Sequence, residues 1–125
     1  MTQEDEQQQQ HCYTYINSVE EFEMLKSDND YVVAIYSAGW CGPCKTLKQW
    51  LDLDYADFTY PIVVIDIDEP DVSDIIGDVS ALPTIEVYHK NQIVYRTEGF
   101  DKPKVNVLLN DICNKREIIS TTDIN

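Results

Sequence analysis

The chain has 125 residues, 43% of them hydrophobic and 26% charged, which is typical of one globular domain with a single core. Its 9 lysine and arginine residues stand against 23 aspartate and glutamate residues, so the formal net charge is −14. Such an acidic excess argues against a protein that binds the phosphate backbone of nucleic acid or an anionic membrane surface, because both partners attract clustered cations.

The N-terminal sequence MTQEDEQQQQ carries acidic and amide side chains where a secretory signal would carry positive charge and then an apolar run. It predicts a flexible, acidic and glutamine-rich segment over residues 1–12. No run of 18 apolar residues occurs, so the sequence predicts no membrane-spanning helix. Together these features predict a cytoplasmic protein. In that reducing compartment, a short Cys-x-x-Cys spacing indicates a catalytic or metal-binding site before a structural disulfide.

Apolar periodicity, capping residues and turn residues predict nine elements along the rest of the chain. The first three are a short strand (13–16), a helix capped by Ser18 and Glu21 that ends near 27–30, and a buried strand (31–36). Next come a helix that begins at the cysteine motif and includes Leu47, Trp50 and Leu51, a second buried strand (61–67), and a short helix (69–76) followed by Gly77. The last three are two strands (84–88 and 93–97) joined as a hairpin and a helix with the apolar stripe Val105, Leu108, Leu109 and Ile112.

The resulting order, β-α-β-α-β-α-β-β-α, belongs to the α/β fold class. Strands separated by helices are expected to be parallel, and the final hairpin adds an antiparallel edge. We therefore predict a central mixed β-sheet flanked by helices on both faces. The predicted domain spans residues 13–116, and residues 117–125 are predicted to form a C-terminal tail.

The sequence Trp40-Cys41-Gly42-Pro43-Cys44 lies between a buried strand and the start of a helix. Free backbone N–H groups and the helix dipole favour negative charge at that point, and so favour the thiolate, which is the attacking form in disulfide exchange. Cys41 is the candidate nucleophile, and Cys44, one helical turn further, is the candidate resolving thiol. Gly42 permits the tight turn, and Pro43 suits the first turn of a helix.

The cysteine pair has two other interpretations. It could form half of a structural zinc site, but zinc takes four ligands, and the remaining candidates are scattered along the chain: His11, Cys12, His89 and Cys113. It could also be a pair of buried thiols without a redox role, which the particular sequence of the motif disfavours. Dithiol–disulfide exchange is therefore the predicted chemistry.

The segment Trp40–Lys45 matches the active-site motif of thioredoxins, and the similarity extends beyond it. Ala81-Leu82-Pro83-Thr84 lies where thioredoxins have a loop that ends in a cis-proline. Gly99 lies where they have a glycine after the last strand, and Asp66-Ile67-Asp68 also resembles the family. Over residues 13–115 the chain resembles the thioredoxin family, whose fold has the predicted order of elements.

The resemblance implies a protein-disulfide reductase that acts on disulfide-containing client proteins and is recharged by an NADPH-dependent thioredoxin reductase. It also implies a monomer with no bound cofactor and no metal. Lys45 would add a cation beside the motif, Pro83 would be cis and face the cysteine pair, and the backbone of Leu82 would pair with an extended client segment. The implied substrate face consists of Trp40, Gly42, Pro43, Leu82, Thr84, Gly99 and Phe100.

Three positions depart from the thioredoxin pattern. Ile35 stands six residues before Cys41, where thioredoxins bury an aspartate that assists proton transfer at the second cysteine. Val64 replaces a lysine or an acid, and Gln49 replaces a proline that kinks the active-site helix. We therefore expect a straighter helix and an apolar site behind Cys44, which would disfavour its thiolate and slow the release of product.

Two alternative functions stay open at this point. Disulfide isomerases and oxidases share the fold, but they usually carry histidine in place of Pro43 and need an oxidising compartment. A binding or assembly subunit with this fold could have dispensable cysteines.

Two cysteines and two histidines lie outside the motif. Cys113 lies at the edge of the apolar stripe of the last helix, which predicts a half-buried packing thiol. Cys12 lies beside the acidic N-terminal segment, where an exposed thiol could join two chains by a disulfide. His11 and His89 are predicted to be solvated residues with no partner cluster.

Overall fold

A computed structural model of the chain describes residues 11–114. Residues 1–10 of the predicted N-terminal segment (1–12), residues 115 and 116 of the predicted domain (13–116) and the predicted tail (117–125) lie outside the described residues. The predicted elements form in the predicted order, and the predicted helix at 69–76 is divided into a short 3₁₀ helix, η1, and the α-helix α4. They are β1 (Tyr13–Tyr15), α2 (Val19–Asp28), β2 (Tyr31–Ser37), α3 (Gly42–Asp54), β3 (Ile62–Asp66), η1 (Pro70–Val72), α4 (Ser73–Ile76), β4 (Thr84–His89), β5 (Gln92–Glu98) and α5 (Lys102–Cys113).

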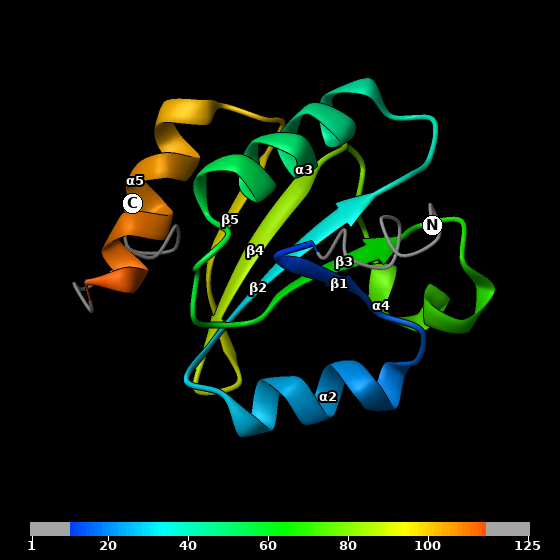
Figure 1. The fold of residues 1–125 in the computed structure, drawn as a ribbon. Helices are drawn as coiled ribbons and strands as arrows, with labels where there is room; N and C mark the ends of the chain where they lie inside the picture. The colour runs from blue at the N-terminus through cyan, green and yellow to red at the C-terminus, as the bar shows by residue number, and fades with distance from the viewer. Residues whose placement is uncertain (1–10, 115–125) are drawn as a thin grey trace, which may run out of the picture.

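The strands form one mixed sheet in the order β1-β3-β2-β4-β5 (Figure 1). β3 pairs in parallel with β1 and β2, whereas β4 is antiparallel to β2 and β5. The expectation of parallel strands wherever a helix intervenes is therefore wrong for β4. The helices before β4 have only three and four residues, so each spans about 6 Å and cannot return the chain along the length of β3. β4 consequently begins at the edge where β3 ends.

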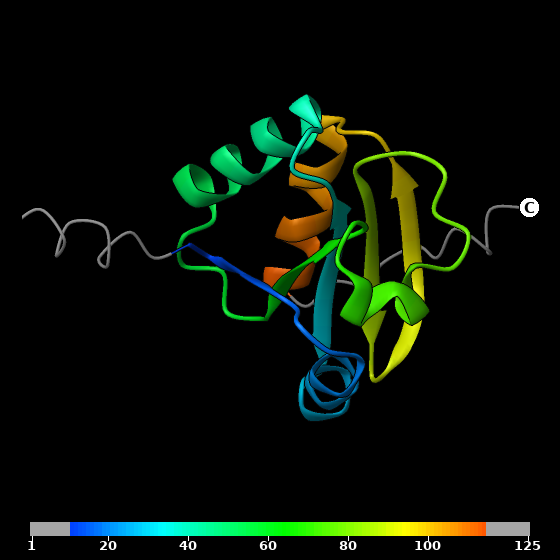
Figure 2. The same cartoon turned by 90° about the vertical axis from the view of Figure 1, so that its right-hand side faces the viewer.

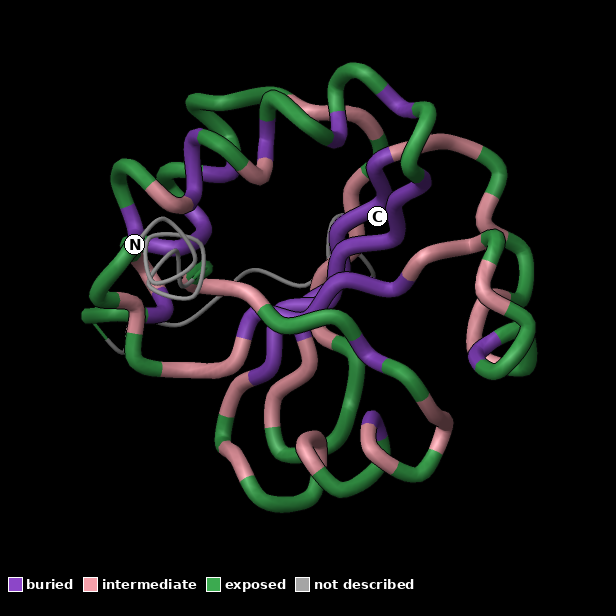
Figure 3. The backbone as a smooth tube through the Cα atoms, turned by 45° about the vertical axis from the view of Figure 1, so that its right-hand side comes forward, coloured by how far each residue is buried: buried purple, intermediate pink, exposed green. Residues whose placement is uncertain are grey.

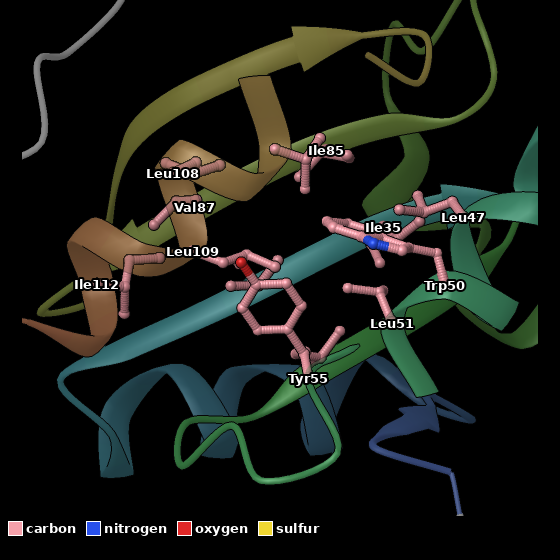
Figure 4. Close-up of a cluster of buried hydrophobic side chains, with 13 residues drawn as sticks. Ile35, Leu47, Trp50, Leu51, Tyr55, Ile85, Val87, Leu108, Leu109 and Ile112 are labelled. Atoms are coloured by element: carbon pink, nitrogen blue, oxygen red, sulfur yellow. The ribbon is translucent and has the colours of Figure 1, made fainter. Parts of the chain in front are cut away.

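Helices cover both faces of the sheet, as predicted (Figures 1 and 2). α3 and α5 pack on one face, and α2, η1 and α4 pack on the other. Figure 4 shows side chains of α3 and α5 meeting Ile35 of β2 and Ile85 of β4. Each fully buried leucine or isoleucine contributes about 1.5–3 kcal/mol to stability. The predicted stripe on α5 is buried at all four positions: Val105, Leu108, Leu109 and Ile112.

β2 is enclosed on both faces, which explains its apolar run without alternation. Six of its seven residues are buried (the purple segments at the centre of Figure 3 include them). Val33 and Ile35 face the α3 side, whereas Val32, Ala34 and Tyr36 face the α2 side. The cysteine motif therefore follows directly from the interior of the sheet.

Local signals in the sequence account for two boundaries. Ser18 caps α2, because its hydroxyl accepts the backbone N–H of Glu21 at 3.1 Å. Lys90 and Asn91 form the turn between β4 and β5 with φ values of 52° and 67°, the left-handed geometry of a two-residue hairpin turn.

No helix in residues 11–114 is long and apolar enough to cross a membrane.

Candidate active site

The cysteine motif forms the turn from β2 into α3. Cys41 is the N-cap of α3, and its backbone N–H donates to the carbonyl of Ala38 at 3.1 Å. The backbone N–H of Cys44 donates to Sγ of Cys41 at 3.2 Å, so a sulfur takes the place of the usual capping oxygen. Pro43 lies in the first helical turn, as predicted. Cys41 and Cys44 are joined by a disulfide, with their Cα atoms 5.3 Å apart.

The two cysteines differ in their access to solvent. Cys44 has an exposed fraction of 0%, and Cys41 one of 5%. Both pack against Ala38, Ile67 and Leu82 in a small apolar cluster. Only Cys41 also lines a groove at the surface. A molecule in this groove would therefore meet the sulfur of Cys41 first.

The groove beside Cys41 has a volume of about 540 Å³. The side chain of Trp40 is 69% exposed there, and its indole N–H donates to the carboxylate of Asp68 at 3.0 Å. A tryptophan that exposes this much apolar surface next to a disulfide is suited to contact a partner. The lining residues are Trp40, Cys41, Gly42, Pro43, Ile67, Val79, Ser80, Ala81 and Leu82.

The segment before β4 is held in place from two sides. The Leu82–Pro83 peptide bond is cis, as the resemblance implies, and Leu82 packs against the cysteine pair. Gly99, with φ of 81°, donates its N–H to the carbonyl of Pro83 at 2.7 Å. The hydroxyl of Thr84 donates to the carbonyl of Ala81 at 2.7 Å. These bonds fix the residues around Pro83 next to the groove.

Part of the predicted substrate face lies in the groove, namely Trp40, Gly42, Pro43 and Leu82. The other three predicted residues, Thr84, Gly99 and Phe100, are not among the lining residues. Thr84 is fully buried, Gly99 bonds to Pro83, and Phe100 packs on the ring of Trp50 with centroids 5.6 Å apart. Lys45 is exposed on α3, and its backbone N–H donates to the carbonyl of Cys41 at 3.2 Å.

Four residues of the groove are not among the predicted site residues: Ile67, Val79, Ser80 and Ala81. Ile67 follows the end of β3, so only the sheet order brings it beside the cysteine turn. The other three directly precede the Leu82–Pro83 pair, and that position was the available signal for them.

Apolar residues fill the positions at which thioredoxins bury ionisable groups. Ile35 and Val64 are register partners on β2 and β3, with exposed fractions of 1% and 0%. Ile85 of β4 pairs with Ile35 from the other side. α3 runs without interruption through Gln49. The core beneath the cysteine turn is therefore apolar along three neighbouring strands.

Cys12 is half-buried where β1 approaches α3. Its backbone N–H donates to the carboxylate of Asp52 at 2.9 Å. Burial, followed by the effect of the Asp52 carboxylate, raises the pKa of Cys12 to about 12. Burial also acts to raise the pKa of Asp52, but hydrogen bonds from Cys12 and His11 outweigh it and lower that pKa.

Cys113 differs from its prediction, and two histidines outside the groove make contacts that the sequence did not indicate. Cys113 is exposed, because the buried stripe of α5 ends at Ile112. His11 has partners: it pairs with Asp52 and stacks on Tyr13. His89 stacks on Tyr31, with ring centroids 4.3 Å apart. Within residues 11–114, no group of three or more histidine, cysteine, aspartate or glutamate side chains is arranged to hold a metal ion.

A buried carboxylate lies on the opposite face of the sheet from α3. Glu86 accepts the hydroxyl groups of Tyr36 at 3.1 Å and Tyr88 at 2.8 Å, and Arg96 lies 3.4 Å from its other oxygen. Burial, followed by the negative charge of Glu86, raises the pKa of both tyrosines. Arg96 also reaches Asp78, the residue before the groove segment, at 3.5 Å. Every charge in this cluster has a partner.

Comparison with known proteins places this geometry in a family. The thioredoxin family model matches residues 14–112. The thioredoxins of Oryctolagus cuniculus and Mus musculus are 33% and 35% identical to the chain over 93 and 94 residues, which cover 72% of this chain and 88% and 89% of theirs. The crystal structure of thioredoxin from Trypanosoma brucei brucei has a TM-score of 0.72 at 26% identity, covering 86% of this chain and 96% of that one.

The chain therefore belongs to the thioredoxin family, and it is a thiol-disulfide oxidoreductase of the protein-disulfide reductase type. Members of this family act on disulfide-containing substrates and are reduced by thioredoxin reductase.

Proposed function

We propose that Cys41 opens the client disulfide and that Cys44 resolves the mixed disulfide. The observation that carries this assignment is the difference in access between the two sulfurs. Cys41 lines the groove, whereas Cys44 has no exposed surface. A client sulfur that enters the groove can reach Cys41 without any movement of the core.

The backbone supports a thiolate at Cys41. The N–H of Cys44 points at its Sγ from 3.2 Å, and the start of α3 carries the positive end of the helix dipole. Both interactions favour the negatively charged sulfur over the neutral thiol. The nucleophile is thus stabilised by groups that belong to the helix itself.

The reaction begins from the reduced pair. The Cys41 thiolate attacks one client sulfur, a mixed disulfide forms, and the other client sulfur leaves as a thiolate that takes up a proton. Cys44 loses its proton and attacks the sulfur of Cys41. The Cys41–Cys44 bond forms, the second client sulfur leaves as a thiolate, and it also takes up a proton. Two electrons pass to the client, and the protein ends in its disulfide form.

We further propose that an NADPH-dependent thioredoxin reductase returns two electrons to this chain, and that the chain works as a cytoplasmic monomer without a bound cofactor. The exposed Trp40 beside the disulfide supports a shared docking surface for reductase and client. Unpaired Cys12 and Cys113 support a reducing compartment, because free thiols persist there.

The test is reduction of insulin disulfides with dithiothreitol as electron source. We expect clear activity for the native chain and only the dithiothreitol background for Cys41→Ser. Cys44→Ser is expected to accumulate the mixed disulfide, visible by mass spectrometry under non-reducing conditions. A native chain no faster than the background would favour the binding or assembly subunit instead, whose role would survive replacement of both cysteines by serine.

A further inference from the structure

The groove beside Cys41 has an apolar lining and an acidic border. Ile67, one of the lining residues, lies between Asp66 and Asp68, and Asp68 accepts the indole N–H of Trp40. The chain then forms η1 and α4 before it returns to the groove at Val79. The segment that joins two lining residues thus carries a series of acidic side chains, which we call the acidic border: Asp66, Asp68, Glu69, Asp71 and Asp74.

Basic residues are missing from this part of the chain. No lysine or arginine occurs between Lys48 and Lys90, a stretch with ten acidic residues. Arg96 pairs with Asp78 and Glu86 only. Within residues 11–114, no lysine, arginine or histidine forms an ion pair with any residue of the acidic border. Among the described residues, no ion pair therefore compensates the negative charge of the acidic border.

We infer that the groove prefers client disulfides that are flanked by lysine or arginine side chains. This inference rests on the reductase function and refines it. Carboxylates alone would form only a solvated acidic surface, but Asp68 is hydrogen-bonded to Trp40 of the groove. Asp66 directly precedes the lining residue Ile67, and the other three lie on the segment that joins Ile67 to Val79. The redox-active disulfide at which a client must bind lies in the same groove. A lysine or arginine next to the client cysteine would pair with the carboxylates of the acidic border. An acidic client segment would be repelled by them.

The size of the preference follows from the exposure of the acidic border. One exposed ion pair changes a binding constant by about 1.4- to 5-fold, so replacing two glutamates beside a client cysteine by two lysines should change binding about tenfold at low salt. Screening removes most of this effect at high salt, because the Debye length falls from about 30 Å at 0.01 M to about 3 Å at 1 M. A preference that persisted at high salt would need another cause.

The experiment uses three cyclic peptides with one disulfide each, identical except for lysine, glutamine or glutamate at the two positions beside one cysteine. The full chain is reduced beforehand, and single-turnover rate constants are measured at about 10 mM and about 1 M NaCl. Each rate constant is divided by that of dithiothreitol on the same peptide at the same salt concentration. Because dithiothreitol also attacks as a thiolate, this division corrects for the intrinsic reactivity of the disulfide and for the attraction that any thiolate would feel. We expect a lysine-to-glutamate ratio of about ten at low salt and below about two at high salt.

A matched pair of variants separates the acidic border from the charge of the whole molecule. Asp71→Asn with Asp74→Asn removes two exposed carboxylates from the border. Asp54→Asn with Asp57→Asn removes two exposed carboxylates, one at the last residue of α3 and one three residues beyond it. α3 has 13 residues and is therefore about 20 Å long. The first pair should lower the lysine-to-glutamate ratio about threefold, and the second should leave it within about 1.5-fold.

Two results would overturn the inference while leaving the reductase function intact: equal corrected rates for the three peptides at low salt, or an equal loss of preference in both variant pairs. Failure to reduce any of the peptides, including the glutamine peptide, would instead overturn the reductase function and the inference together.

Discussion

At the scale of single residues, the two cysteines outside the groove have opposite surroundings. Cys12 is half-buried beside Asp52, and its pKa is raised to about 12, so it has almost no thiolate at about pH 8. Cys113 is exposed at the end of α5. Because the thiolate is the reactive form, oxidation or alkylation at Cys12 should be slow in the folded protein.

We expect iodoacetamide at about pH 8 to alkylate Cys113 well before Cys12 in the folded protein, and both at similar rates in guanidinium chloride. Peptide mass spectrometry after timed quenching measures both sites at once. Asp52→Asn removes the nearby negative charge and should speed the labelling of Cys12, because a smaller rise in pKa leaves more thiolate. Equal rates at both sites in the native fold would contradict the protected position of Cys12.

Ile35 presents a second test at this scale. It shares a core cluster with Leu47, which lies one helical turn after Cys44 on α3. In Ile35→Asp, burial would raise the pKa of the new carboxyl, and its charged form could accept the proton of Cys44. Product release in single-turnover experiments should therefore accelerate as the pH rises through that raised pKa.

Ile35→Asn is the matched control, because asparagine has nearly the same shape and does not titrate. Both variants should lose about 2–5 kcal/mol of unfolding free energy, since each buries a polar group in place of an apolar one. The pH dependence should appear only in the aspartate variant. Identical pH profiles for the two variants would show that the apolar surroundings do not limit release.

At the scale of elements, the turn of the β4–β5 hairpin contains a residue with a strained backbone conformation, which a substitution can relieve. Lys90 has φ of 52°, a left-handed conformation that costs a residue with a Cβ about 1–2 kcal/mol. Glycine adopts it freely but is more flexible in the unfolded chain. We therefore expect Lys90→Gly to stabilise the protein by about 0.5–1 kcal/mol in urea unfolding. The backbone bond from this residue to the carbonyl of Asp30 would remain.

A substitution at the neighbouring residue, Asn91, should change stability in the opposite direction. Asn91 has φ of 67°, and asparagine tolerates this region better than alanine does. Asn91→Ala should therefore destabilise the same hairpin. If Lys90→Gly lowered the unfolding free energy, some contact of the lysine side chain, and not its backbone conformation, would control this turn.

Elements were predictable from the sequence where the signal is local. The apolar run of β2, the Ser18 cap and the stripe on α5 all reflect spacing within one segment, and the structure confirms them. The direction of β4 was not predictable, because it depends on how far the preceding helices carry the chain. The prediction that Cys113 is half-buried was wrong for a related reason. The residue that follows the last apolar position of a helical stripe already lies outside the buried face.

At the scale of the whole molecule, the redox pair was predictable and its surroundings were only partly so. Cys41 and Cys44 are joined as the motif indicates, and the cis peptide before Pro83 follows from the resemblance. The groove also takes Ile67 from the end of another strand, which only the folded sheet brings close. Likewise, Glu86 lies in an alternating strand, and its partners come from two other strands as well as its own.

The position of β2 has a consequence for how the molecule opens. β2 is bonded to β3 on one side and to β4 on the other, and helices cover both of its faces. Backbone amides in such a strand exchange with deuterium only through the rarest, largest openings. The sulfurs that break and re-form a bond in every cycle are thus attached to the part of the chain that opens least often. Repeated turnover can proceed without exposing the interior to aggregation or proteolysis.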